Sequence, residues 1–319
     1  MDEFALIKRY FSDIGAIPEL PALAQAIQEG IGNDCAILRI PPQFDLCLSI
    51  DTLVSGIHFL PDAPADRLAY RALAVNLSDL AAMGAQPLCF TLALTLPESN
   101  ELWLQAFSRG LDRAARQYAI RLVGGDTTRG PLSITIQVQG VVTAGQGLRR
   151  SGAQKGDLIC VTGVLGDANA ALGILGKGNP AEWESYFLSR YYEPSPRLRE
   201  GLALSGLATA CIDVSDGLLA DLAHILESSG CGAVIRDDAI PLSEALRGTA
   251  INPLTHALEG GDDYELCFTI SESNLALLRD REPTLRFTEI GSIVSTPGLR
   301  RLNHRGEIMC INPVGYKHF

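Results

Sequence analysis

The sequence lacks the features that mark secreted, membrane and zinc-binding proteins. No charged segment followed by an apolar run opens the chain, and no uninterrupted apolar run is long enough to span a bilayer. The eight cysteines lie far apart and form neither a C-x-x-C pair nor a cluster with histidine. We therefore expect a cytoplasmic protein that does not insert into membranes and whose cysteines are reduced, small buried residues.

The sequence also lacks a basic block. Its 26 Lys and Arg residues stand against 37 Asp and Glu residues, so the net charge is −11. This balance makes nucleic acid an unexpected partner. An acidic protein can still bind a small polyphosphate where divalent cations lie between its carboxylates and the phosphate groups.

Common nucleotide-binding signatures are absent as well. The segment "GILGKGN" at 173–179 lacks the G-x-x-x-x-G-K-[ST] spacing of a phosphate-binding loop, and "GVLGDANA" lacks the G-x-G-x-x-G pattern of dinucleotide-binding proteins. The H-R-D motif of protein kinases is also missing. If this protein uses ATP, it does so on a different scaffold.

The sequence does contain enough apolar material for two folded domains. It has 319 residues, of which 47% are hydrophobic and 20% charged, a composition typical of core-forming proteins. Glycine and charged residues replace the periodic apolar pattern in "TAGQGLRRSGAQKGD". We therefore predict two domains, residues 1–146 and 147–319.

Both predicted domains combine helices and strands. In the first, strands are predicted in "FDLCLSIDTLV", "LCFTLALTL" and "LSITIQVQGVV", and helices in "MDEFALIKRYF", "ADRLAYRALAVNLSDLAAMGA" and "ELWLQAFSRGLDRAARQYA". The second of these helices could be interrupted near Asn76. In the second domain, strands are predicted in "DLICVTGVLG" and "YELCFTI", and helices in "DANAALGILG" and "DGLLADLAHILESSG".

Five stretches share a pattern in which a strand-like apolar run ends in an aspartate beside Gly, Ser or Thr. They contain Asp34, Ser49 with Asp51, Asp79, Asp126, and the pair Asp213 and Asp216. Carboxylates with small neighbours suit Mg²⁺, and glycines let backbone N–H groups approach phosphate oxygens. Each such aspartate alone is more commonly a turn or helix-cap residue, and the pattern does not establish that the five stretches meet in space.

Taken together, the motifs resemble the thiamine-monophosphate kinase family, which belongs to the superfamily of aminoimidazole ribonucleotide synthetase and selenophosphate synthetase. The resemblance runs in order from about Gly30 to the C-terminus, in "GIGNDCA", "DTLVSGIHF", "ALAVNLSDLAAMGA", "GGDTTRGPLS", "RSGAQKGD", "IDVSDGLLADL", "GGDDYELCFT" and "GYKHF". It implies ATP-dependent, Mg²⁺-dependent phosphorylation of thiamine monophosphate to thiamine diphosphate, the last step of thiamine diphosphate biosynthesis.

The resemblance also implies an architecture. An N-terminal α/β domain would bind ATP and Mg²⁺, and its strands would form a barrel with those of a second subunit. A C-terminal α+β domain would complete the acceptor site. The expected partners are therefore ATP, thiamine monophosphate and a second copy of the chain in a homodimer.

Carried over position by position, the resemblance implies several Mg²⁺ ions held by Asp34, Ser49, Ile50, Asp51, Asp79, Asp126, Asp213 and Asp216. It implies ATP contacts from Gly125, Asp126, Arg150 and Ser215, and acceptor contacts from His58, Asp262 and Tyr316. Among these residues, Asp126, Arg150 and Asp216 are expected to be catalytic. The acceptor is a phosphate monoester whose second pKa, near 6, leaves it largely dianionic, so it needs no general base. His58 is therefore expected to bind the acceptor.

Three positions depart from the family pattern. Ile50 stands where Thr is frequent, which leaves only a main-chain oxygen for a metal, and Asn33 stands where a second Asp is common. Asp262 replaces the usual Glu and shortens the reach of the carboxylate by one methylene.

Two other functions stay open at this point. One is a sister enzyme that uses ATP to activate an amide or a selenide, although Cys35 lies in the apolar context "NDCAIL" rather than in a reactive loop. The other is a nucleotide-binding regulator without turnover, against which the intact aspartates argue. His58 could also be a structural histidine, and Tyr316 a hydrophobic plug. Release of ADP with and without thiamine monophosphate discriminates between these functions.

Overall fold

The computed structural model describes residues 3–16, 25–313 and 315–316, and its chain divides into two compact units. The first unit contains residues 1–80 and 85–145, and the second contains 81–84 and 146–319. The division at 145–146 lies beside the boundary expected from the sequence, whereas the position of 81–84 in the second unit was not expected. Residues 1–2 of the first predicted helix and 317–319 of the "GYKHF" motif lie outside the described residues.

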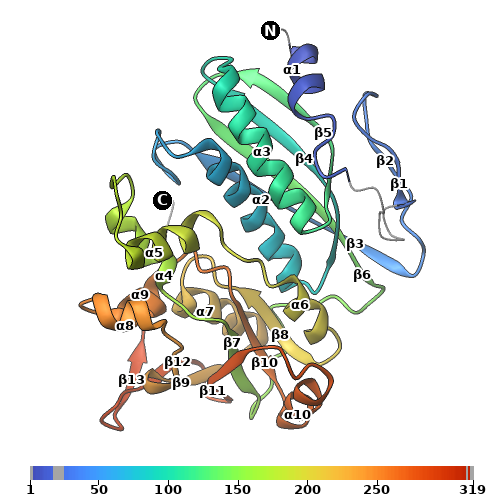
Figure 1. The fold of residues 1–319 in the computed structure, drawn as a ribbon. Coiled ribbons are helices and arrows are strands. Elements are labelled where there is room, and N and C mark those ends of the chain that lie inside the picture. The colour runs from blue at the N-terminus through green and yellow to red at the C-terminus, as the bar shows by residue number, and fades with distance from the viewer. Residues whose placement is uncertain (1–2, 17–24, 314, 317–319) are drawn as a thin grey trace. The chain divides into compact units, whose positions relative to one another are not determined.

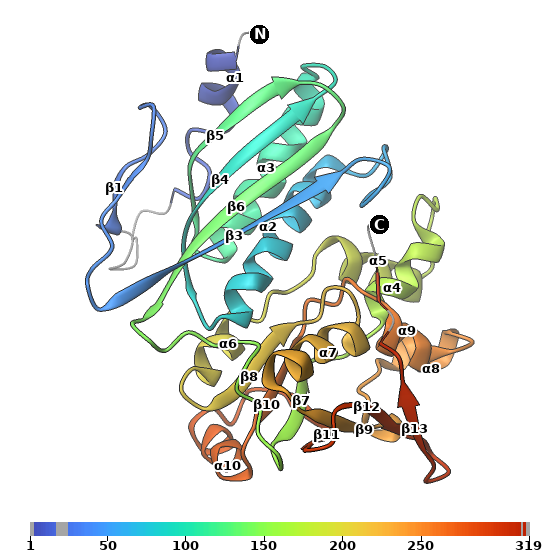
Figure 2. The same ribbon diagram turned by 180° about the vertical axis from the view of Figure 1, so that it is seen from behind.

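The first unit is built on a four-stranded sheet with the strand order β3-β6-β4-β5 (Figure 1). The strands are β3 (Phe44–Val54), β4 (Gln86–Leu96), β5 (Arg121–Arg129) and β6 (Ser133–Thr143). Only β4 and β5 pair in parallel. Helices α2 (Ala65–Ala82) and α3 (Glu101–Gln117) lie on one face, and the opposite face is turned toward the viewer in Figure 2.

Helices α2 and α3 pack closely against each other. Residues at their ends are of the types that favour the start and the end of a helix. Asn100 caps α3, because its side chain accepts a hydrogen bond from the backbone N–H of Trp103 at 3.1 Å. A Cβ atom at Gly110 of α3 would lie 1.9 Å from the carbonyl oxygen of Asp66 in α2, so only glycine fits at this crossing. Gly84, with φ of +65°, follows the end of α2 in the left-handed conformation typical of helix termini.

The predicted interruption of α2 near Asn76 is wrong. The helix is continuous from Ala65 to Ala82. Asn76 stays in the helix because its side-chain N–H donates to the carbonyl of Ala72 at 2.9 Å, and its Oδ1 accepts the backbone N–H of Asp51 at 3.0 Å. A residue that ordinarily favours turns is thus used to join α2 to strand β3.

Among the described residues, the first unit also contains the small elements α1 (Glu3–Tyr10), β1 (Ile27–Glu29) and β2 (Ile37–Leu38). The ring of Phe11, just after α1, meets that of Phe107 of α3 edge to face at 6.5 Å between centroids. The β1–β2 hairpin packs on the sheet through an apolar cluster that includes Cys89, Val123 and Val141.

The second unit is built on a seven-stranded sheet with the order β13-β12-β9-β11-β7-β10-β8. The strands are β7 (Leu158–Thr162), β8 (Ala208–Asp213), β9 (Gly232–Arg236), β10 (Leu266–Ile270), β11 (Phe287–Val294), β12 (Gly298–Leu302) and β13 (Ile308–Ile311). The β9–β12 pair alone is parallel. Two buried apolar clusters form its core.

Short helices surround this sheet: α4 (Asp167–Ala171), α5 (Glu182–Tyr192), α6 (Leu198–Leu204), α7 (Leu218–Ser229), α8 (Glu244–Thr249), α9 (Pro253–Glu259) and α10 (Glu272–Arg281). The 3₁₀ turns η2 (Leu172–Ile174) and η3 (Asp237–Ala239) accompany them. The helix predicted in "DANAALGILG" is shorter than expected, because the α-helix ends at Ala171. It is followed by η2, which ends at Ile174, and then by Gly176 in the left-handed conformation.

The mixture of helices and strands expected from the sequence is confirmed in both units. Neither sheet closes on itself within the described part of the chain. Among the same residues, no helix combines the length and the apolar composition that crossing a membrane would require.

Candidate functional site

The five aspartate stretches mostly do not have the predicted strand-end geometry. Asp213 is the last residue of β8, but Asp51 and Asp126 lie inside strands β3 and β5. Asp79 lies in α2, because the apolar residues before it follow helical spacing, and Asp34 lies in the connection between β1 and β2.

Strand β3 and helix α2 bring three of the predicted metal ligands together. The hydroxyl of Ser49 donates to Oδ2 of Asp79 at 2.5 Å. Asp51 lies two residues further along the same face of β3. The residue keeps exposed surface, but its carboxyl group is crowded, and this loss of solvent together with the charge of Asp79 raises its pKa to about 6. A divalent cation would be stabilised beside these two carboxylates.

Asp126 does not join this group within one chain. Paired residues of neighbouring strands point to the same face of a sheet, and Asp51 is in line with Ile136, Leu92 and Gly125 across the four strands. Asp126 follows Gly125 and therefore points to the opposite face. Strands β3 and β5 are also opposite edges of the sheet, about 14 Å apart at three strand spacings. Asp51 and Asp126 of the same chain would thus bind separate ions.

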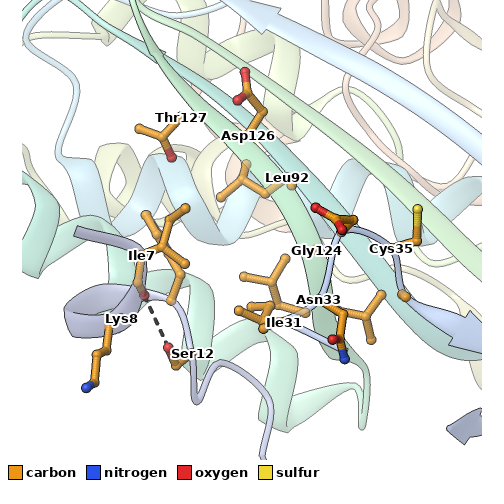
Figure 3. A pocket seen from close by; sticks show the side chains of 17 residues that line it. Ile7, Lys8, Ser12, Ile31, Asn33, Cys35, Leu92, Gly124, Asp126 and Thr127 are labelled. Atoms are coloured by element: carbon orange, nitrogen blue, oxygen red, sulfur yellow. Dashed lines mark hydrogen bonds between the residues drawn. The ribbon is translucent and has the colours of Figure 1, made fainter. Parts of the chain in front are cut away.

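A cavity of about 670 Å³ lies beside β5 in the first unit and is lined by Asp34, Gly125 and Asp126. Figure 3 shows Ile7, Lys8 and Ser12 on one side of it and Asn33 and Cys35 on the other. The volume is within the range of small-molecule sites in proteins. Predicted ATP and metal contacts are therefore found together on the wall of one cavity.

His58 lies in a tight turn that follows β3. The backbone N–H of Val54 donates to Nδ1 of His58 at 2.9 Å, and the backbone N–H of His58 donates to the carbonyl of Val54 at 2.9 Å. Because Nδ1 accepts a hydrogen bond, the proton of the neutral ring is on Nε2. Nε2 is therefore the hydrogen-bond donor of the neutral ring.

In the second unit, the turn from Asp213 to Gly217 is fixed by Asp221 of α7. Its Oδ2 accepts the backbone N–H groups of Ser215, Asp216 and Gly217 at 2.9, 3.0 and 3.2 Å. Burial raises the pKa of Asp221 to about 7; the charge of Asp216 adds to this rise, and the three N–H groups oppose it. Neither Asp213 nor Asp216 caps α7, because the N-cap residue is Gly217 and no side chain caps the helix. Asp221 instead fixes the turn that precedes the helix.

The same turn lies beside two predicted acceptor contacts. The backbone N–H of Asp262 donates to the carbonyl of Ser215 at 2.9 Å, and that of Tyr316 donates to the carbonyl of Asp216 at 3.2 Å. A Cβ atom at Gly261 would lie 2.3 Å from the Ser215 carbonyl oxygen, so the close approach requires glycine. The chain thus brings Ser215, Asp216, Asp262 and Tyr316 together from three distant segments.

Arg150 lies in an exposed segment beside β8, where the backbone N–H of Cys211 donates to the carbonyl of Arg149 at 2.8 Å. Among the described residues, the guanidinium group of Arg150 makes no hydrogen bond or ion pair. It is therefore available for an anionic ligand, for which a guanidinium is well suited.

The sequence motifs did not predict the buried ion network of the second unit. Glu265, fully buried, accepts hydrogen bonds from Arg190 at 2.9 Å, Arg197 at 2.5 Å and the Thr162 hydroxyl at 2.7 Å. The neighbouring Asp263 accepts the N–H of Gly166 with both carboxylate oxygens. The signal was available, since a glutamate inside the apolar strand pattern "YELCFTI" requires a buried partner.

The predicted metal ligands divide between the two units, six in the first and two in the second. Within the portion of the chain that the structure describes, no group of three or more His, Cys, Asp or Glu side chains is arranged to hold a metal ion.

Comparison with known proteins identifies the family. The AIR synthase related protein, N-terminal domain model matches residues 32–142, and the corresponding C-terminal domain model matches 154–299. A thiamine-monophosphate kinase of Salmonella typhimurium is 50% identical over 86% of this chain and 85% of its own length. The chain belongs to the thiamine-monophosphate kinase family. The resemblance inferred from the sequence motifs is thereby confirmed.

Solved structures of the thiamine-monophosphate kinase family have the same fold. That of the Stenotrophomonas maltophilia enzyme is 42% identical and superposes with a TM-score of 0.86 over 96% of this chain and 98% of that one. A structure of AaThiL complexed with AMPPCP and TMP is 31% identical, with a TM-score of 0.80 over 88% of this chain and 89% of that one. The two family models span every predicted site residue except Arg150, which lies between them, and Tyr316, which lies after them.

Proposed function

We propose that this chain transfers the γ-phosphoryl group of ATP to thiamine monophosphate and forms thiamine diphosphate and ADP. The observation that carries the proposal is the likeness to AaThiL, which has been solved with AMPPCP and TMP. The relatives named thiamine-monophosphate kinase at 46% identity over 99% of this chain support it further.

The proposed reaction is a direct in-line transfer. A bond forms between an oxygen of the acceptor phosphate and the γ-phosphorus, and the bond from that phosphorus to the β–γ bridging oxygen breaks. The acceptor is already ionised at neutral pH, so no proton has to be removed. The difficulty is to bring two anions together, which makes positioning and charge neutralisation the main sources of catalysis.

The paired acids of the first unit fit Mg²⁺. Asp51 and Asp79, with Ser49 and the backbone of Ile50, would hold cations there. Burial and then the charge of Asp79 raise the pKa of Asp51, and a cation would compensate that charge. Asp34 and Asp126 would act at the cavity, and Asp213 and Asp216 in the second unit. Divalent cations bound to these groups would neutralise the phosphates of the two substrates.

The remaining contacts follow from the same chemistry. ATP would be contacted by Gly125 and Asp126 on the cavity wall, by Ser215 in the fixed turn and by the guanidinium of Arg150. His58 would donate a hydrogen bond from Nε2 to the acceptor rather than remove a proton, because its Nδ1 is occupied by the Val54 N–H. Asp262 and Tyr316 would hold the ring end of the acceptor.

We further propose that the chain forms a homodimer in which the sheets of two first units build a barrel. Strand β3 presents Leu46, Leu48 and Ile50 on the face away from α2, and these side chains are 41%, 59% and 58% exposed. An apolar row on an uncovered sheet face is typical of an interface. All eight cysteines are free, which supports the cytoplasmic location expected from the sequence.

One assay tests the proposed reaction. ADP release from ATP and Mg²⁺ is measured with and without thiamine monophosphate, and the product is separated by chromatography. We expect ADP release to depend on thiamine monophosphate and to match thiamine diphosphate formed one for one. ADP release without the acceptor, or none in its presence, would contradict the proposal.

A further inference from the structure

The segment that carries Asp262 has an unusual backbone. Asp262 and Tyr264 have φ angles of +72° and +51°, in the left-handed region. Residues other than glycine rarely adopt this conformation, although Asp and Asn tolerate it better than most. Two such residues separated by a single residue persist only where surrounding contacts hold them.

Backbone hydrogen bonds hold this segment against the turn at the end of β8. The Asp262 N–H donates to the carbonyl of Ser215 at 2.9 Å, and the Tyr264 N–H donates to that of Val214 at 2.8 Å. In return, the Val214 N–H donates to the carbonyl of Glu265 at 2.7 Å. The segment is therefore tied directly to the turn that presents Ser215.

Buried side chains hold the segment from its other side. Asp263 and Glu265 are 2% and 0% exposed and point into the unit, where they bind the Gly166 N–H and the guanidinium groups of Arg190 and Arg197. Asp262 precedes these two buried acids, and Tyr264 lies between them in the chain. The hydroxyl of Tyr264 donates to Oδ1 of Asp262 at 3.1 Å.

We propose that Tyr264 is a positioning residue that orients the carboxylate of Asp262 for the acceptor. The tyrosine is only 9% exposed, so its ring is fixed by packing, and its hydroxyl limits the rotation of the short Asp262 side chain. The carboxylate of Asp262 is thus held in a defined direction. Such a carboxylate suits the cationic ring or an amino group of the acceptor. The inference rests on the proposed function, in which Asp262 contacts thiamine monophosphate.

The test removes the hydroxyl and keeps the ring. Calorimetric titration with thiamine monophosphate and with a non-hydrolysable ATP analogue, together with steady-state kinetics, is carried out on the full-length wild type, Y264F, D262N and the double variant. We expect Y264F to weaken acceptor binding and raise its KM at least about fivefold, with kcat and ATP affinity within about twofold. In the D262N background, Y264F should have almost no further effect, because the two residues act as one unit.

A matched control is available in the same unit. The hydroxyl of Tyr186 also donates to a carboxylate, that of the buried Asp167, at 2.6 Å. Y186F removes an equivalent hydrogen bond and should leave the KM for thiamine monophosphate unchanged, while any loss of thermal stability resembles that of Y264F.

The results separate the two claims. A wild-type protein without acceptor-dependent ADP release would contradict the proposed function itself. If the wild type is active, unchanged acceptor affinity in Y264F, or an equal loss in the D262N background, would overturn the positioning role. A Y264F protein that does not fold would overturn it as well, because the hydroxyl would then serve the fold rather than acceptor binding.

Discussion

At the scale of single residues, Asp51 and Asp79 belong to the proposed cation site of the first unit, where loss of solvent and the charge of Asp79 raise the pKa of Asp51. We expect Asp79→Asn to lower kcat/KM at least about a hundredfold, or about 2.7 kcal/mol of transition-state stabilisation, since a ligand charge is lost. Folding should survive, because one of two like charges is removed. Steady-state ADP release at saturating Mg²⁺ measures the effect, with the exposed Asp62→Asn as control. Near-normal turnover of the variant would falsify the ligand assignment.

His58 offers a second test at this scale. With Nδ1 occupied by the Val54 N–H, we expect His58→Gln to raise the KM for thiamine monophosphate more than it lowers kcat, because the role is binding. Kinetic constants measured across a range of pH check this. A collapse of kcat at unchanged KM, with loss of one limb of the pH profile, would instead make His58 a proton-transfer residue.

The sequence predicts which residues can form the site better than it predicts their backbone conformation. The left-handed conformation of Asp262 cannot be read from "GGDDYELCF", but it gives a physical reason for the departure from glutamate, since Asp tolerates positive φ more readily. Asp221 was missed for a related reason. Within "DGLLADLAHI" it has the spacing of an ordinary helical surface residue, and only the folded turn directs three N–H groups to it.

At the scale of elements, periodicity predicts long segments well and short ones poorly. Strand β3 has the predicted bounds, Phe44–Val54, because its alternating side chains and flanking turn residues are unambiguous. The segment after Gly166 was predicted too long, because glycines at 173 and 176 end the α-helix early. A helix of five residues has too few turns to produce a clear periodicity of apolar residues in the sequence.

The crossing of α2 and α3 gives a prediction about stability. We expect Gly110→Ala to destabilise the protein by about 1–3 kcal/mol, because its Cβ would lie 1.9 Å from the Asp66 carbonyl oxygen and would force the helices apart. Chemical denaturation followed by circular dichroism measures the change. Gly173→Ala is the matched control, since nothing lies within 4 Å of a Cβ atom there. Equal stability of the two variants would show that the helices can separate without cost.

At the scale of the whole molecule, the uncovered face of the first unit predicts self-association. Leu48→Lys places a charge in the apolar row of β3, and we expect it to shift the protein from dimer to monomer, because a lysine is costly to bury in an interface. Sedimentation velocity at micromolar concentration is the measurement. Ile251→Lys, which changes a 96% exposed residue of the second unit, should not alter the sedimentation coefficient. A dimeric Leu48→Lys protein would argue against this face as the interface.

The two units also divide the substrates between them in the proposed function. Asp34, Gly125 and Asp126 share one cavity in the first unit, whereas Asp262 and Tyr316 lie beside the Ser215–Asp216 turn in the second. The sequence could assign residues to units but could not establish these groupings, because they depend on strand register and on long-range backbone bonds.

A substitution of Tyr316, whose side chain is half-exposed, tests this division of the two substrates between the units. Tyr316→Ala removes an aromatic face but keeps the backbone hydrogen bond to Asp216. We expect acceptor binding to weaken by about 1–2 kcal/mol, the upper range for a cation over an aromatic ring, and ATP affinity to stay within about twofold. Calorimetric titration with a non-hydrolysable ATP analogue and then with thiamine monophosphate measures both, with the exposed Trp183→Ala as control. Equal losses of affinity for the two ligands would indicate that Tyr316 has a structural role as a hydrophobic plug. Unchanged acceptor affinity would show that Tyr316 does not contribute to acceptor binding.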